Sequence, residues 1–128
     1  MHNFKSLKNM VKTASLGFPR IGANRELKKA VESFWKNQSS EADLLKVATE
    51  IKANNWHLQK NAGIDFVPSN DFSFYDHILD NIALFGAVPH RFVENLGFKI
   101  GNEINLETLF AMARGIQKNG IDLTAMEM

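Results

Sequence analysis

The chain has 128 residues, no cysteine and a formal net charge of +1, and its length is that of one ordinary domain. Its 45% hydrophobic and 23% charged residues are typical of a packed globular protein and exclude a disordered or membrane-embedded chain. The balanced charge excludes a field that would attract nucleic acid, and the missing cysteines exclude disulfides, thiol nucleophiles and cysteine-ligated zinc within the chain.

The beginning of the chain predicts no targeting signal. Residues 1–9 form a polar leader without the continuous apolar run of a secretory signal, and Met10 is an equally good start. No apolar stretch reaches the roughly 18 residues that a membrane-spanning helix needs, so we expect a cytoplasmic protein without membrane contact. None of the four histidines lies three to five residues from another, so no metal site is predicted: His2, His57, His77 and His90.

The first predicted elements are a strand and an amphipathic helix. A short apolar run at residues 13–18 predicts a strand that must stop at Pro19. Asn24 is a good N-cap for the following helix, and Glu26 places a favourable negative charge in its first turn. The apolar residues that follow have helical spacing: Leu27, Ala30, Val31, Phe34 and Trp35.

A second helix and a second strand complete a unit of strand, helices and strand. Ser40 and Asp43 have the spacing of a capping box, and the helix that they begin should stop at Gly63. The short apolar run at residues 64–67 is closed by Pro68 and predicts the second strand. This order is typical of a βαβ unit, in which the two strands are parallel.

The second half of the chain predicts two further helices. One covers residues 74–85 and ends at Gly86, and the other covers residues 106–114, with Gly115 after it. Residues 89–105 are irregular, with no element predicted. Asn119 and Gly120 predict a turn, and residues 121–128 begin another ordered segment.

The two predicted strands and the ordered segment at residues 121–128 do not close a sheet. Parallel strands are stable almost only inside a complete sheet that helices cover. The fold class is therefore α/β, and we expect a helix-rich, partial (β/α)8 barrel of the TIM type that contains only the N-terminal βα units. On this interpretation residues 10–128 are a truncated N-terminal barrel domain behind the polar leader.

Basic side chains surround the predicted start of the first helix. Gly17 and Gly22 have the spacing of a phosphate-binding loop, but Ala23 and Asn24 stand where that motif needs Lys and Ser or Thr. The unpaired N–H groups and positive dipole of a helix start favour a carboxylate or phosphate, and guanidinium groups can grip a carboxylate. The cations in question are Arg20, Arg25, Lys28 and Lys29. On spacing alone, the better explanation is that Arg25, Lys28 and Lys29, together with Glu26, are the solvated face of an amphipathic helix.

Residues 16–30, LGFPRIGANRELKKA, resemble the opening motif of cobalamin-independent methionine synthases, with its GFPR-x-G and RELKKA elements. Further landmarks of that family cover nearly the whole chain after Met10. They are Phe34 and Trp35, NNWHLQKNAGID at 54–65, VPSNDFSFYDH at 67–77 and LFAMARG at 109–115.

The resemblance implies a zinc-dependent methyltransferase of methionine biosynthesis. In that family zinc activates the thiol of homocysteine, which takes the methyl group of a polyglutamylated 5-methyltetrahydrofolate, and no cobalamin is used. The RELK element helps to bind the folate and its glutamate tail, so this role falls to Arg25, Glu26, Leu27 and Lys28. Glu26 and Leu27 could contribute backbone atoms alone.

The family's zinc ligands belong to a second, C-terminal barrel, to which nothing in this sequence corresponds. We therefore expect the isolated fragment to bind folate polyglutamate, to hold no zinc and to lack activity. The alternative is a non-catalytic, truncated α/β interaction module, which large exposed apolar patches would favour. Asp76 and His77 are adjacent and point to different sides of a helix, so they are not expected to form a catalytic dyad. The neighbouring aromatic residues are interpreted as core: Phe72, Phe74 and Tyr75.

Overall fold

The computed structural model describes residues 11–97 and 103–126. The polar leader at residues 1–9, part of the segment predicted to be irregular and the last two residues of the chain lie outside this description. The chain divides into two compact units, one ending at Phe74 and the other beginning at Tyr75. We call them the N-terminal unit and the C-terminal unit. No helix in the described residues is both long and apolar enough to cross a bilayer.

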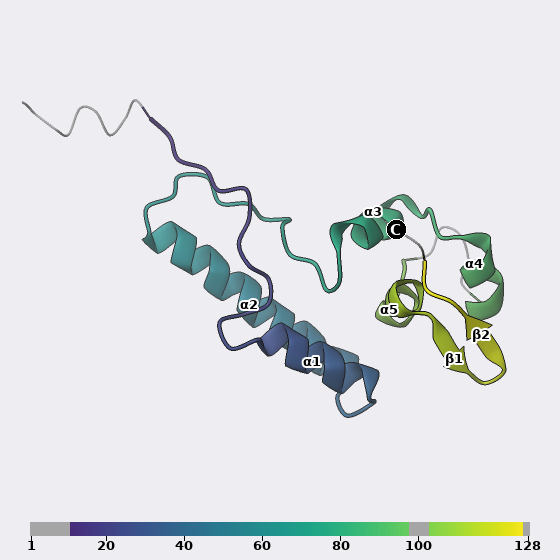
Figure 1. The fold of residues 1–128 in the computed structure, drawn as a ribbon. Coiled ribbons are helices and arrows are strands. Elements are labelled where there is room, and N and C mark those ends of the chain that lie inside the picture. Colours follow the sequence, from purple (N-terminus) through teal and green to yellow (C-terminus); the bar gives the residue numbers. More distant parts are fainter. Residues whose placement is uncertain (1–10, 98–102, 127–128) are drawn as a thin grey trace, which may run out of the picture. The chain divides into compact units, whose positions relative to one another are not determined.

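The N-terminal unit is built on two helices that pack side by side, α1 (Glu26–Trp35) and α2 (Glu41–Asn61) (Figure 1). The predicted apolar stripes form the contact, because residues three and four apart lie on one face of a helix. The buried hydrophobic residues of this unit all belong to the two helices: Leu27, Val31, Leu44, Ala48 and Ile51.

The ends of α2 confirm the helix signals in the sequence. The Ser40 hydroxyl accepts a hydrogen bond from the Asp43 N–H at 3.2 Å, and the Asp43 carboxylate accepts one from the Ser40 N–H at 2.9 Å. This reciprocal pair is the predicted capping box. The helix ends at Asn61, and Gly63 follows with a φ of 85°, a conformation that favours glycine.

The two predicted strands of this unit were wrong as regular strands. Residues 13–18 and 64–67 contribute one isolated parallel bridge, between Ala14 and Phe66. The Phe66 N–H donates to the Thr13 carbonyl at 3.0 Å, and the Ser15 N–H donates to the Phe66 carbonyl at 3.3 Å. The parallel direction is that of a βαβ unit. A lone pair of short parallel segments has no neighbouring strand among the described residues to extend its ladder.

The C-terminal unit packs three helices and a hairpin around one hydrophobic cluster. The helices are α3 (His77–Phe85), α4 (His90–Leu96) and α5 (Leu106–Arg114), and the strands are β1 (Ile116–Lys118) and β2 (Ile121–Leu123) (Figure 1). The side chains of Leu79, Phe92 and Met112 are fully buried at the centre of the cluster. Each comes from a different helix, so the cluster joins all three.

Helix α5 has the predicted bounds, whereas the other two helices needed corrections. Helix α3 begins at His77 instead of residue 74, because the Asp76 carboxylate caps it by accepting the N–H groups of Ile78 and Leu79. Asp76 thus has a structural role, and no dyad with His77 forms. Helix α4 lies where no element was predicted. It is short, follows Pro89 and ends at Gly97, so its apolar period was too brief to recognise.

The predicted turn at Asn119 and Gly120 is confirmed as the loop of a two-residue hairpin. Their φ angles of 54° and 82° are the left-handed values that such a tight turn requires. The strands pair antiparallel, with Ile116 opposite Leu123. In the described residues the molecule is thus helix-rich with one small two-stranded sheet, compatible with the α/β class.

Candidate anion site at the start of helix α1

Residues 19–25, which we call the link, connect the first parallel segment to α1 and are held by backbone hydrogen bonds. The Leu27 N–H donates to the Ile21 carbonyl at 3.1 Å, and the Arg25 N–H donates to the Gly22 carbonyl at 3.2 Å. Arg25 is the N-cap residue, with a φ of 62° and no hydrogen bond from its side chain to the cap. The prediction of Asn24 as N-cap was wrong, because its side-chain amide donates to Glu26 instead of accepting from the helix.

A carboxylate of the chain itself already lies at this helix start. Glu26 accepts hydrogen bonds from the Asn24 N–H at 2.9 Å and from the Asn24 Nδ2 at 3.2 Å. Its own backbone N–H, then that of Asn24 and, more weakly, the charge of Lys29 lower the pKa of Glu26 below its ordinary value. The same carboxylate folds over Gly22, where an added Cβ would overlap it. Glu26 therefore satisfies donors that an external anion would otherwise find free.

The structure separates the four predicted tail-binding residues into two groups. Arg25 and Lys28 are exposed, and the Lys28 Nζ lies 3.5 Å from the Glu32 carboxylate, one turn further along α1. Leu27 is only 1% exposed and packs in the core between the helices. Its N–H is also occupied by the Ile21 carbonyl. The groups presented to solvent are thus the guanidinium and the ammonium.

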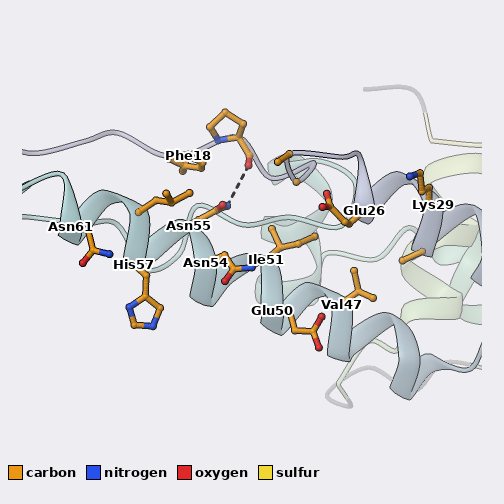
Figure 2. A pocket seen from close by; sticks show the side chains of 15 residues that line it. Phe18, Glu26, Lys29, Val47, Glu50, Ile51, Asn54, Asn55, His57 and Asn61 are labelled. Carbon is orange, nitrogen blue, oxygen red and sulfur yellow. Dashed lines mark hydrogen bonds between the residues drawn. The ribbon is translucent and has the colours of Figure 1, made fainter.

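A groove of about 1120 Å³ lies beside this helix start, between the link, α1 and α2 (Figure 2). Of the four predicted residues, only Glu26 lines it. Lys29, which the sequence placed among the cations around the first turn, also lines it. Its other walls are mostly apolar, and the side chains that form them include Phe18, Ala30, Val47, Ile51 and Leu58.

The groove residues on α2 were not predicted as part of a site. Val47, Ile51, Asn54, Leu58 and Asn61 recur at helical spacing along one stripe. Their periodicity is visible in the sequence, but periodicity does not show which segment lies beside a stripe. Figure 2 shows how the link reaches this face: the Asn55 side chain donates to the Pro19 carbonyl at 3.3 Å.

The remaining predicted cation, Arg20, directs its guanidinium to residues 73 and 74 instead of to the groove. Its Nη1 donates to the carbonyls of Ser73 and Phe74, each at 3.1 Å. The rings of Phe72 and Phe74 meet edge to face with centroids 5.5 Å apart, and Lys52 lies over the Phe72 ring. These contacts fit the interpretation of the aromatic residues as packing groups. The sequence grouped Arg20 with the helix cations because it is near them in the chain, which was wrong.

The arrangement is suited to binding an anion. Its exposed guanidinium and ammonium, in the N-cap and first turn of α1, recognise carboxylates well, although Glu26 already satisfies backbone donors at the helix start. Across the described residues, no three His, Asp or Glu side chains converge as metal ligands.

Comparison with known proteins gives several relatives of one kind. The chain is 52% identical over 118 residues to the 5-methyltetrahydropteroyltriglutamate–homocysteine methyltransferase of Flavobacterium johnsoniae, covering 92% of this chain and 15% of the relative. It is 53% identical over 116 residues to the enzyme of that name in Nitrosomonas europaea, covering 91% and 14%. The Saccharomyces cerevisiae enzyme is 46% identical over 125 residues, covering 93% and 16%.

The chain therefore spans only about one sixth to one seventh of the length of these relatives. The resemblance predicted from the RELK region is confirmed, since identity of this degree extends over nine-tenths of the chain. Residues 12–128 match the family described as the N-terminal domain of the cobalamin-independent synthase, and the chain belongs to this family.

Proposed function

We propose that this chain is the folate-binding portion of a methyltransferase that moves the methyl group of 5-methyltetrahydropteroyltri-L-glutamate to homocysteine, giving methionine. The names of its relatives support this reaction, because they state the methyl donor and the acceptor. The observation that carries the local role is the pair of exposed cations, Arg25 and Lys28, in the first turn of α1. A triglutamate tail is a string of carboxylates, which matches this pair in charge.

The contacts at the helix start refine how the tail is held. Because Glu26 and the Ile21 carbonyl already accept the backbone N–H groups of Asn24 and Leu27, tail carboxylates bind to the side chains of Arg25 and Lys28. Arg25 supplies a planar fork that suits a bidentate contact, and Lys28 exchanges its ion pair with Glu32 for one with the tail. Glu26 and Leu27 hold the helix start in place, so their part is structural.

The wider fold of this proposal is a partial (β/α)8 barrel. Two observations support it: the parallel bridge at Ala14 and Phe66, and the helices α1 and α2 that connect the two bridged segments. In such barrels ligands bind at the carboxyl ends of the strands. The link to α1 follows the carboxyl end of the first segment, so the proposed tail site lies on that side.

The zinc chemistry belongs to the parent enzyme. This chain contains no cysteine, and its described residues hold no group of three acidic or histidine ligands, so they do not fit a zinc site. In the parent, zinc would activate the homocysteine thiol through ligands outside this chain. The role proposed for this chain is therefore to bind the methyl donor.

Titration of the purified chain with folates of different tail length tests this function. We expect 5-methyltetrahydrofolate triglutamate to bind more tightly than the monoglutamate. Arg25→Ala and Lys28→Ala should each weaken triglutamate binding roughly tenfold, about 1.4 kcal/mol, and leave monoglutamate binding nearly unchanged. Lys36→Ala, which removes an exposed cation just beyond the other end of α1, is the matched control. Equal affinity of the unsubstituted chain for both folates would refute the tail site.

One observation favours a second candidate, a non-catalytic interaction module. Several large apolar side chains are exposed, with Leu16 fully exposed and Leu84 and Phe85 at 74% and 78%. Exposed apolar groups suit protein contacts when they are contiguous. The same titration separates the candidates, because an interaction module has no reason to distinguish folates by tail length.

A further inference from the structure

Two segments far apart in the sequence run side by side in the N-terminal unit. They are residues 13–20 and 65–74, which we call the paired segments. Their contacts begin where the Thr13 N–H donates to the Asp65 carboxylate at 2.9 Å. After the bridge at Ala14, they continue where the Phe18 N–H donates to the Asp71 carboxylate at 2.8 Å. The pairing thus extends well past the short parallel bridge.

Arg20 makes the last of these contacts. Its Nη1 donates to the carbonyls of Ser73 and Phe74 at 3.1 Å each, and Ser73 is only 2% exposed. A guanidinium is always charged and holds its donors in a rigid plane, so one side chain can fix two successive carbonyls. Arg20 therefore ties the end of the first paired segment to the end of the second.

Arg20 lies close along the chain to the contacts that hold the start of α1. Arg20 is followed directly by Ile21, whose carbonyl accepts the Leu27 N–H at 3.1 Å. Leu27 is buried against α2, and the Pro19 carbonyl accepts a hydrogen bond from Asn55 on the same helix (Figure 2). Because the link between Arg20 and α1 is short and held by these hydrogen bonds, a displacement of Arg20 should also displace the first turn of α1.

We propose that Arg20 is a positioning residue for the polyglutamate site: by holding the Ser73 and Phe74 carbonyls, it sets the first turn of α1 and with it Arg25. This inference rests on the proposed function for its ligand. Its structural half, the control of the helix start by a distant loop, does not depend on any ligand. Arg20 itself makes no contact with the tail.

Amide hydrogen exchange of the full chain tests the structural half. In Arg20→Gln, we expect the Arg25 and Leu27 amides to exchange at least about tenfold faster, while amides in the middle of α2 keep their rates. Arg20→Lys retains the charge and one point of contact, so it should restore part of the protection. Arg91→Gln is a matched control, because Arg91 likewise donates to a carbonyl, that of Ala125, in the C-terminal unit. Unchanged exchange in Arg20→Gln would overturn the proposal.

Folate titration tests the functional half. We expect Arg20→Gln to reduce the preference for triglutamate over monoglutamate roughly fivefold or more, Arg20→Lys to reduce it less, and Arg91→Gln to leave it unchanged. A folded Arg20→Gln chain with the full preference overturns the positioning role. If the unsubstituted chain shows no preference, the proposed function fails, and hydrogen exchange still decides whether Arg20 sets the helix start. Should Arg20→Gln fail to fold, the comparison of Arg20→Lys with the unsubstituted chain decides both points.

Discussion

The two units of this chain are stabilised by different kinds of contact. In the C-terminal unit, three helices meet at one apolar cluster in which Leu79, Phe92 and Met112 are fully buried. In the N-terminal unit, two helices share a narrow core, and polar groups connect the rest. Examples are the bonds from Phe18 to Asp71 and from Arg20 to Ser73. Hydrogen bonds are directional and apolar packing is not, so the N-terminal unit is the better one for positioning a ligand.

The distribution of exposed apolar side chains follows the same division. Seven of the ten large hydrophobic residues that are exposed in the described part of the chain lie in the N-terminal unit, including Leu16, Leu58 and Phe66. Because fewer apolar side chains are buried there, polar contacts must contribute more to the stability of the N-terminal unit. The comparison teaches that the same substitution should have different consequences in the two units.

The largest expected effect comes from the apolar cluster. Phe92→Ala should destabilise the C-terminal unit by about 3–5 kcal/mol, because it leaves a cavity at a fully buried position. Both tryptophans, Trp35 and Trp56, lie in the N-terminal unit, so their fluorescence follows that unit alone. We expect urea unfolding observed by tryptophan fluorescence to be unchanged, while the part of the helical circular dichroism that comes from α3, α4 and α5 is lost at lower urea concentration. A matching fall in the fluorescence midpoint would show that the units are not stabilised separately.

Two glycines with positive φ sharpen the comparison between backbone and side-chain contacts. At Gly115, φ is 78° and an added Cβ would lie 2.5 Å from the Leu123 carbonyl oxygen, a backbone atom of the hairpin. Gly115→Ala should therefore destabilise the C-terminal unit by about 2–4 kcal/mol in thermal unfolding. At Gly22, the atoms nearest to an added Cβ belong to the Glu26 side chain, which can move more easily than backbone, so Gly22→Ala should cost about 1–2 kcal/mol.

Gly63→Ala is the control for both substitutions. Its φ is 85°, but nothing lies within 4 Å of an added Cβ. The loss of stability in Gly63→Ala, about 1 kcal/mol, measures the conformational term alone. Equal losses at Gly63 and Gly115 would contradict the proposed clash with the hairpin.

Local features such as helix caps and turns were predicted better from the sequence than the pairing of strands. The capping box at Ser40, the stop at Gly63, the bounds of α5 and the turn at Asn119 were all readable, because each depends on neighbouring residues. The bridge at Ala14 was predicted as a longer strand, since a short apolar run does not show how many partners it has. Helix α4 was missed because seven residues contain less than two full periods.

The charge of the candidate site could be predicted from the sequence, but the contacts of its side chains could not. The charges of Arg25 and Lys28 and the motif around them are properties of the sequence. Three features are visible only in the structure: the hydrogen bonds between the Glu26 carboxylate and Asn24, the burial of Leu27, and the direction of the Arg20 side chain. Each depends on which of several possible partners a side chain reaches, and spacing along the chain does not decide between them.

Helix caps provide a smaller test of the comparison, with one cap from each unit. Ser40→Ala removes an oxygen that accepts the Asp43 N–H, and Asn105→Ala removes one that accepts the Thr108 N–H at 2.8 Å. Each should cost about 1 kcal/mol in its own unit. We expect only Ser40→Ala to lower the urea midpoint observed by tryptophan fluorescence. Ser40→Thr keeps a hydroxyl cap and should retain most of the midpoint, and a loss as large as that of Ser40→Ala would argue against the capping role.

The smallest expected effect is a pH dependence of the N-terminal unit. Three contacts lower the pKa values of its carboxyl groups: the Glu26 backbone N–H for Glu26, the Ser40 hydroxyl for Asp43 and the Thr13 N–H for Asp65. A carboxyl group whose pKa is lowered in the folded state stabilises the fold at a pH above its ordinary pKa, which is 4.5 for Glu26 and 3.8 for Asp43 and Asp65. This stabilisation is lost as the pH falls through the folded-state pKa. We therefore expect the midpoint observed by tryptophan fluorescence to fall between about pH 6 and about pH 3. Asp43→Asn cannot ionise, so it should show a shallower fall, whereas an equally steep one would assign the pH dependence to other groups.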